Sequence, residues 1–483
     1  MTSYPVTFTL CGCAVSLCDK VVTNRISRYG TARSILFPIV LSPIPRLATA
    51  MTFIFLVALS LRIAFLAHEA QVIPGNVLAY VPFDQEVGSV AKALVEGQGF
   101  SCLFRQPTGP TAWLAPVYPL LLAGIFKVFG VFSLSSFYAA ALLNCLFSAL
   151  ACFPVFSAGK RVSGLPAAAA ASWLWAIFPS GILFPTEWIW DTSLSALLGA
   201  TLLWATLRLA ESSRTRDCVG YGIVWGLSLL TNPALGALFP ILFGWVAYCH
   251  FRRGLLYPTR LALVFAILLA MCLPWTVRNA VQFHRLIPLR SNFPFELWMG
   301  NNEIYDEHSR EVNRITRFEQ IRHYTQLGES AFLNEKWQKA RRFISGHPGL
   351  TLRLFGRRIV ATWLGTESPQ RDFLHPDSLL VALVFAWNVL VLVAVLVALV
   401  RLRMQRNLFF FPIAAFPVVF PIVYYLTQTS LRLRHPCDPI LALTAILALP
   451  VFPLLSDSSV LQFGLDPDAS RQPARQVDSR SVR

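Results

Sequence analysis

The chain has 483 residues, of which 55% are hydrophobic and only 14% are charged, and its mean hydropathy is +0.56. This balance excludes an ordinary soluble domain. The formal net charge is +16, but the basic residues fall in short blocks between apolar runs, which is typical of a membrane protein and not of a nucleic-acid-binding protein. Only helices satisfy their backbone hydrogen bonds across a lipid bilayer without closing into a barrel. The composition therefore predicts an all-α polytopic membrane protein.

About ten membrane-spanning helices are predicted from the apolar runs, since a bilayer core of roughly 30 Å needs about 20 apolar helical residues. They lie approximately at 48–67, 135–157, 164–183, 191–209, 219–232, 234–250, 260–277, 378–400, 408–427 and 437–455. Asn232-Pro233 breaks the pair at 219–250, for which a tight or partly re-entrant hairpin is the alternative.

Basic residues in the short loops determine the predicted orientation. Lys160, Arg161, Arg252 and Arg401 all fall on one side, which is therefore expected to be cytoplasmic, with both termini inside. Residues 1–47 are predicted to be a poorly ordered cytoplasmic leader before a signal anchor, the alternative being a start at Met51. Residues 456–483 are predicted to be a cytoplasmic polar tail.

Two long segments are predicted outside, separating a transmembrane core (48–277) from C-terminal transmembrane helices (378–455). The first outer loop, 68–134, contains an apolar helical stripe within 84–97, expected on the membrane surface, and an apolar juxtamembrane helix over 116–132. The second segment, 278–377, is predicted to be an extracytoplasmic loop domain with a basic amphipathic helix at 350–364.

This topology brings charged residues from distant parts of the chain to the outer ends of the helices. They are Asp84, Arg105, Glu187, Arg278, Arg432, Arg434 and His435. A carboxylate can act as general base on an acceptor hydroxyl, and guanidinium groups bind phosphate through charge-assisted hydrogen bonds. The convergence therefore predicts an extracytoplasmic site for a phosphate-bearing substrate.

Each of these residues also has a structural interpretation. Asp84 and Glu86 are alternatively solvated loop acids, and Glu187 and Asp191 are alternatively caps of the helix that begins near 191.

The basic candidates have similar alternatives. Arg278, Arg432 and Arg434 are alternatively anchors for lipid headgroups, and Arg62 is expected to reach the membrane interface. His435 is more often structural than catalytic.

The sequence indicates no cofactor site. The ten cysteines form no CxxC pair or zinc spacing, so no metal is indicated. Cys102 and Cys437 are the two expected outside, where free thiols are favoured over a disulfide. There is no Walker A sequence, and Gly97-Gln98-Gly99 lacks the third glycine of a dinucleotide-binding loop.

Several short motifs, in order, resemble bacterial glycosyltransferase family 39, relatives of the protein O-mannosyltransferases and of the lipid A aminoarabinose transferase. The motifs are Phe83-Asp84-Gln85-Glu86, Glu96-Gly97-Gln98-Gly99-Phe100, Ala115-Pro116-Val117-Tyr118-Pro119, Leu273-Pro274-Trp275-Thr276-Val277-Arg278-Asn279, Pro288 to Asn292, Glu296-Leu297-Trp298, Gly300-Asn301-Asn302 and Arg432-Leu433-Arg434-His435-Pro436. The resemblance covers roughly 48–455. It implies the GT-C fold and a polyprenyl-phosphate sugar donor.

The resemblance implies an aspartate as catalytic base, and Asp84 is the matching position. From their charge and predicted position, Glu86 and Glu187 are candidate supporting acids. The candidate ligands of the donor phosphate are Arg105, Arg278, Arg432 and Arg434. The expected reaction transfers a hexose or pentose, with inversion, to a hydroxyl of a lipid, glycan or protein of the cell envelope, in the inner membrane with the site facing the periplasm.

Two other classes of function remain open from the sequence. A transporter or flippase of a lipid-linked substrate would need charged residues at mid-membrane depth and often an internal repeat, and neither is found. A non-catalytic assembly subunit is the third interpretation.

Overall fold

The computed structural model describes residues 44–72, 86–104, 106–212, 214–254, 258–302, 318–365 and 378–455. The regular structure of these residues is helical. Ser101 and Pro110 also form an isolated antiparallel β-bridge. The chain divides into two units, 1–52 and 53–483. Helix α2 (Ile44–Val72) begins in the first unit, and all later helices belong to the second.

The helices of the second unit follow one another with short connections. They are α4 (Glu86–Val95), α5 (Val117–Phe129), α6 (Leu134–Leu150), α7 (Cys152–Ala176), α8 (Pro179–Glu187), α9 (Thr192–Glu211), α10 (Thr215–Thr231), η2 (Pro233–Leu238), α11 (Phe239–Arg252), α12 (Pro258–Phe283), α13 (Phe293–Gly300), α14 (Phe318–Gly346), α15 (Pro348–Leu364), α17 (Ser378–Met404), α18 (Phe410–Val418), α19 (Ile422–Leu426), α20 (Leu431–Arg434), η3 (His435–Cys437) and α21 (Asp438–Leu447).

Six stretches of the described chain are long and apolar enough to cross a membrane. They are Thr49–Ala70, Leu134–Ala176, Thr192–Glu211, Pro233–Arg252, Pro258–Phe283 and Ala382–Met404. The all-α, multi-pass architecture predicted from composition is thereby confirmed. Other predicted spans fall on shorter helices such as α8, α10, α18, α19 and α21, so the number of about ten stays a prediction.

Helix α7 is a hairpin. Its backbone leaves helical geometry at Gly164, where φ is 84° and ψ is −177°. The Ser172 hydroxyl donates to the Cys152 carbonyl at 3.2 Å, although 20 residues of straight helix would separate these groups by about 30 Å. The two halves of α7 therefore run side by side, and Lys160 and Arg161 stand just before the reversal, where the sequence predicts a short basic loop.

Helix α9 lies at the centre of the bundle. Of the residues in its apolar stretch, 78% are buried inside the protein. In the apolar stretch of α12 the share is only 17%, so most apolar side chains of α12 face outward. Small residues permit this packing: a Cβ added at Gly199 would lie 2.5 Å from the Pro436 carbonyl oxygen. Helix α9 thus approaches η3 closely enough to fix the chain that carries the predicted arginines of 432–436.

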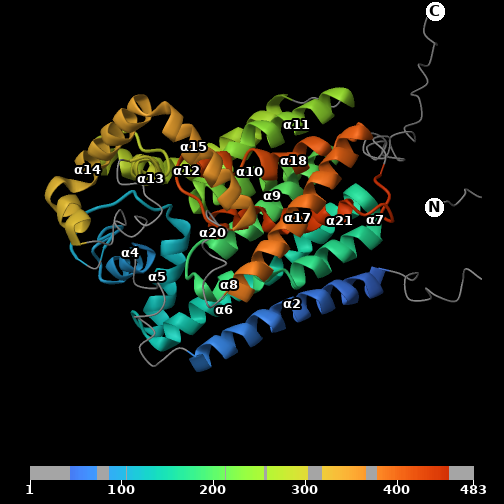
Figure 1. The fold of residues 1–483 in the computed structure, drawn as a ribbon, viewed down its shortest axis with the longest axis horizontal. Coiled ribbons are helices and arrows are strands. Elements are labelled where there is room, and N and C mark those ends of the chain that lie inside the picture. The colour runs from blue at the N-terminus through green and yellow to red at the C-terminus, as the bar shows by residue number, and fades with distance from the viewer. Residues whose placement is uncertain are drawn as a thin grey trace, which may run out of the picture. The chain divides into compact units, whose positions relative to one another are not determined.

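Helices from the described parts of the two long polar segments gather at one end of the second unit, which we call the loop end. Figure 1 shows α4, α13 and α14 together there, away from α7 and α11 at the opposite end. Helix α4 packs on α5, and α13 packs on α14. Three helices expected in these segments are present as α4, α5 and α15, although Val87, Val90 and Ala91 of the α4 stripe are buried within the protein.

Candidate functional site

Five charged side chains from distant parts of the chain interact electrostatically at the loop end. We call them the acid–arginine cluster, and they are Glu86, Asp191, Arg290, Glu296 and Arg432. They come from the start of α4, the residue before α9, the loop before α13, α13 itself and α20. Because more than 340 residues of chain lie between the first and the last (432 − 86 = 346), only the fold brings them together.

Glu86 is the first residue of α4, which packs on α5 and contains the buried Val87 and Val90. Burial raises the pKa of Glu86 to about 7, and the nearby Glu296 carboxylate adds to this rise. Arg290, Arg432 and a hydrogen bond from the Trp113 side chain oppose it. The carboxyl group can therefore gain or lose a proton near neutral pH.

Asp191 occupies the N-cap position of α9, but its side chain does not cap the helix backbone. Its Oδ2 atom accepts a hydrogen bond of 3.1 Å from the Ser195 hydroxyl. Burial raises the pKa of Asp191, while Arg290 and Arg432 lower it. Asp191 therefore occupies the cap position that the sequence offered as its structural interpretation, but its carboxylate bonds the Ser195 hydroxyl and no backbone N–H group.

Glu296 is fixed at both carboxylate oxygens. Asn292 Nδ2 donates to Oε1 at 2.8 Å, and Gln428 Nε2 donates to Oε2 at 2.5 Å. The second bond joins α13 to the chain between α19 and α20. Close contact is possible there because Gly300 has no side chain, since an added Cβ would overlap the Thr427 carbonyl.

Arg432 is held by aromatic rings. Its guanidinium carbon lies 4.3 Å from the centre of the Trp188 ring and 5.1 Å from that of Trp190. Its nitrogens form no hydrogen bond or ion pair with any residue in the described part of the chain, and the residue is partly exposed. Burial lowers the pKa of Arg432, and Asp191, Glu86 and Glu296 oppose this shift.

Arg434, two residues later, is directed into the protein. Its Nε donates to Asp438 at 3.0 Å, Nη1 donates to the Thr362 and Trp363 carbonyls, and Nη2 donates to Asn388 at 3.0 Å. Only 3% of this residue is exposed. We therefore assign Arg434 to the packing of α15, α17 and α20 and not to the donor phosphate.

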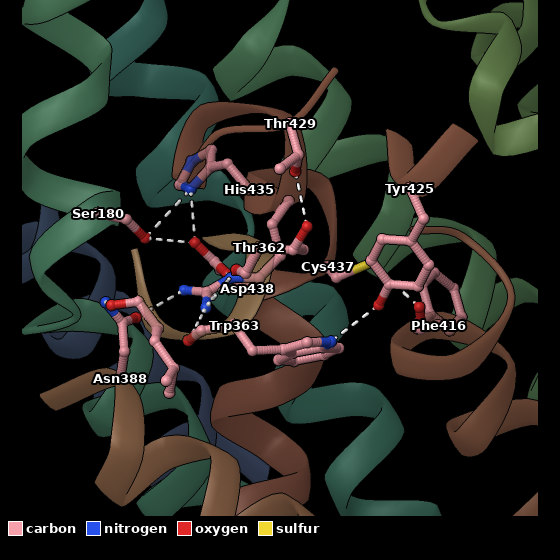
Figure 2. A network of polar contacts seen from close by, with 12 residues as sticks. Ser180, Thr362, Trp363, Asn388, Phe416, Tyr425, Thr429, His435, Cys437 and Asp438 are labelled. Atoms are coloured by element: carbon pink, nitrogen blue, oxygen red, sulfur yellow. Dashed lines mark hydrogen bonds and ion pairs between the residues drawn. The ribbon is translucent and has the colours of Figure 1, made fainter. Parts of the chain in front are cut away.

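His435 belongs to the same buried network. Figure 2 shows Ser180 and His435 both facing the Asp438 carboxylate. The His435 Nδ1 atom lies 3.1 Å from the Ser180 hydroxyl and 3.0 Å from Asp438 Oδ2. The serine hydroxyl donates directly to the aspartate at 2.5 Å, so the histidine does not stand between them as it does in a hydrolase triad. The structural interpretation of His435 fits this arrangement.

Arg278 joins α12 to the segment between α4 and α5. Its Nη1 and Nη2 atoms donate to the Thr111 and Phe100 carbonyls, each at 2.7 Å. Its guanidinium carbon lies 5.0 Å from the centre of the Trp275 ring. These contacts occupy most of its donors, and none of them reaches the acid–arginine cluster.

The remaining predicted residues lie apart or outside the described chain. Glu187 is exposed, and partial desolvation and then the nearby Glu69 raise its pKa. Asp84 and Arg105 lie outside the described residues. Cys102 and Cys437 are free thiols, and the described residues contain no group of acids, histidines and cysteines arranged to hold a metal.

Arg62 corrects one expectation. It does not reach the membrane interface, because its guanidinium is fully buried and donates to Ser148 Oγ at 2.9 Å and to the Ala58 carbonyl at 2.8 Å. It also donates to the Ala176 carbonyl at 3.0 Å, so it joins α2, α6 and α7. A buried guanidinium with this many acceptors stabilises helix packing.

Sequence reasoning did not assign site roles to Arg290, Glu296 or the two tryptophans at 188 and 190. Arg290 and Glu296 lie inside motifs that carry the family resemblance, and this was the sequence feature that could have identified them as site residues. Nothing in the local sequence distinguishes Trp188 and Trp190 from ordinary interfacial aromatics.

The chain matches no family profile and no curated protein. Solved structures with a similar fold include the oligosaccharyltransferase of Archaeoglobus fulgidus tethered to an acceptor peptide, with a TM-score of 0.50 and 17% identity over 84% of this chain and 49% of that one. The archaeal enzyme AglB from Archaeoglobus fulgidus, with an inhibitory peptide and a dolichol-phosphate, gives a TM-score of 0.49 and 15% identity over 84% and 50% of the two chains. ArnT from Cupriavidus metallidurans, bound to undecaprenyl phosphate, gives 0.35 and 12% over 83% and 76%.

The chain thus spans about half the length of the oligosaccharyltransferase. At this identity the likeness concerns the fold alone. Together with the apolar helices, it confirms the predicted GT-C fold in a multi-pass membrane protein.

Proposed function

We propose that this protein is an integral membrane glycosyltransferase that moves a sugar from a polyprenyl-phosphate donor to an acceptor hydroxyl, with inversion at the sugar carbon. The ordered family 39 motifs, the GT-C fold and the acid–arginine cluster at the loop end support this proposal. The bilayer is the inner membrane, and the site faces the periplasm.

The observation that carries the proposal is that Arg432 is held by aromatic rings and forms no hydrogen bond with the described residues. The contact with the Trp188 ring holds the guanidinium group, and its N–H groups form no hydrogen bond with the described residues. Planar guanidinium groups bind phosphate oxygens in pairs of parallel hydrogen bonds. An arginine held without use of its donors is suited to an anionic ligand, here the phosphate of the donor lipid.

The proposed reaction is a direct displacement. A carboxylate removes the proton of the acceptor hydroxyl, the acceptor oxygen bonds to the sugar carbon, and the bond from that carbon to the phosphate oxygen breaks. The bonding electrons leave with the polyprenyl phosphate, whose additional negative charge Arg432 stabilises. Asp84, which precedes Glu86 by two residues in the sequence, is the proposed base.

The other acids of the cluster have supporting roles in this proposal. Glu86, with its pKa raised to about 7, can share or relay a proton near neutral pH. Asp191 and Glu296 oppose the fall in the pKa of Arg432 that burial causes. Glu187, whose electrostatic neighbour is Glu69, is not assigned to the reaction.

Purified protein in lipid nanodiscs tests the proposal. Incubation with a panel of polyprenyl-phosphate hexoses and pentoses, plus cell-envelope acceptors, should release polyprenyl phosphate and form a new glycoside, both detected by mass spectrometry. If donor lipids cross the bilayer of proteoliposomes without release of polyprenyl phosphate, the protein is a flippase and the proposal is wrong.

A further inference from the structure

A loop that precedes α13, at 284–292, is fixed to its surroundings on both sides of Arg290. Thr276 Oγ1 donates to the Pro288 carbonyl at 2.7 Å, and Trp275 Nε1 donates to the Leu289 carbonyl at 2.6 Å. The Ser291 backbone N–H donates to the Ala112 carbonyl at 2.8 Å. This loop is therefore built as a rigid support, although it is largely exposed.

The buried Glu329 carboxylate joins this loop to two other elements. It accepts hydrogen bonds from the Ser291 hydroxyl at 2.6 Å, the Ala112 N–H at 2.9 Å and the Tyr324 hydroxyl at 2.8 Å. Only 4% of Glu329 is exposed. Because this carboxylate connects the first outer loop, the loop at 284–292 and α14, it fixes Arg290 relative to Trp113, the residue after Ala112.

One nitrogen of the Arg290 guanidinium group forms a hydrogen bond within the protein. Its Nε donates to the Trp113 carbonyl at 3.2 Å. Its two terminal nitrogens, Nη1 and Nη2, form no hydrogen bond with the described residues, and the residue is partly exposed. The carboxyls on which it acts electrostatically include Glu86 and Asp191, and Arg432 acts on the same two.

We infer that Arg290 and Arg432 form a two-guanidinium site for a phosphate ester, with Arg290 as the second phosphate-binding residue. This inference rests on the proposed function for the identity of the ligand as the polyprenyl phosphate. Transfer of the sugar changes the phosphate from a diester with one negative charge to a monoester that acquires a second. Two guanidinium groups match the charge that appears on the leaving group better than one does.

The surrounding carboxyls are compatible with an incoming anion. Burial raises the pKa values of both Glu86 and Asp191, so these groups accept a proton more readily than ordinary carboxyls when negative charge approaches.

Binding of polyprenyl phosphate to the full-length protein in nanodiscs tests the inference without reference to sugar transfer. Arg290→Ala should weaken binding by roughly tenfold to a hundredfold, because hydrogen bonds to charged groups contribute about 1.5–3 kcal/mol. Arg290→Lys should give a smaller loss, since the charge remains and the fork is lost. Arg285→Ala, at an exposed arginine in the same loop, is the matched control and should bind as the wild type does.

Two further measurements identify the source of the phosphate. Inorganic phosphate and phosphatidylglycerol should compete weakly if the site recognises the polyprenyl ester, whereas equal competition by phosphatidylglycerol would make it a general headgroup site.

A thermal unfolding curve for each variant separates loss of binding from loss of fold. If the alanine variant does not fold, the binding of Arg290→Lys tests the inference instead.

The outcomes separate this inference from the proposed function. If the wild type binds polyprenyl phosphate, Arg432→Ala weakens the binding and folded Arg290→Ala does not, the role of Arg290 is wrong and the donor class stands. If the folded wild type binds no polyprenyl phosphate, the donor class itself is wrong.

Discussion

The guanidinium of Arg432 lies over the ring of Trp188, with 4.3 Å between the guanidinium carbon and the ring centre. Trp190 lies on the same arginine at 5.1 Å. Contact with aromatic faces fixes the position of the cation and leaves its in-plane donors for a ligand. The tryptophans of the segment before α9 therefore position a binding residue of α20, which follows more than 240 residues later in the chain (432 − 190 = 242).

Arg432→Ala should weaken polyprenyl phosphate binding by at least about tenfold and lower sugar transfer by at least as much. Trp188→Ala should produce a smaller loss of both, because it frees the arginine without removing it. Isothermal titration and transfer assays on nanodisc samples measure the two effects. Arg353→Ala, on the exposed face of α15, is the control, and wild-type behaviour of Arg432→Ala would assign this arginine to lipid anchoring.

Asp438→Ala should lower stability strongly, because it leaves the buried Arg434 guanidinium without its carboxylate partner. Loss of one partner from a buried pair costs about 3–5 kcal/mol. Glu335→Ala removes a more exposed pair with Lys339, where a surface pair contributes about 0–1 kcal/mol. Thermal unfolding in detergent should rank the two variants in this order, and equal unfolding temperatures would contradict the assigned role of Asp438.

The sequence predicted the helices better than it predicted their contacts. Periodicity is local, so the amphipathic helix expected at 350–364 is found as α15 (Pro348–Leu364), and the one expected at 116–132 is found as α5 (Val117–Phe129). The short basic loop near Lys160 likewise corresponds to the turn of the α7 hairpin.

The site was harder to predict, as Arg432 and Arg434 illustrate. Both are basic, both follow α19 and both fall in one motif. Residues two apart on a helix point to nearly opposite sides, so one of them meets Trp188 and the other meets Asp438. Which side is buried depends on α9, α15 and α17, which are distant in sequence. The local pattern therefore identifies the region and not the role of each arginine.

Asp84→Asn tests the proposed base, which lies outside the described residues. Asparagine keeps the shape of the side chain and cannot accept the proton of the acceptor hydroxyl. Transfer should fall by roughly two to four orders of magnitude while donor binding persists. Substantial transfer by the asparagine variant would remove Asp84 from the catalytic role, and joint loss of folding and donor binding would make it structural.

The predicted orientation is testable with engineered cysteines in a chain whose native cysteines have been replaced by serine or alanine. Ser345→Cys, in the exposed last turn of α14, should react with an impermeant maleimide added to intact cells. Arg216→Cys, exposed near the start of α10, should react only after the membrane is permeabilised. The reverse pattern would invert the topology and place the loop end in the cytoplasm.

Glu86→Gln should change how stability depends on pH. The folded protein raises the pKa of Glu86 from 4.5 to about 7, first by burial and then by the neighbouring Glu296, against the opposing charges of Arg290 and Arg432. Below about pH 4.5 the carboxyl is protonated in both the folded and the unfolded chain. As the pH rises to about 7 the unfolded chain loses this proton while the folded chain retains it, so the wild type loses stability over that window.

Glutamine stays neutral at every pH and removes this loss. The unfolding temperature of Glu86→Gln should therefore rise relative to the wild type between pH 5 and pH 8, by an amount equivalent to on the order of 1–3 kcal/mol at the upper end. Glu96→Gln is the control, because that carboxylate is exposed just after the same helix and pairs with Lys92. Differential scanning fluorimetry in detergent at four or five pH values measures the effect. A constant difference between Glu86→Gln and the wild type across this range would mean that Glu86 is ionised throughout, and the shared-proton role proposed for it would be wrong.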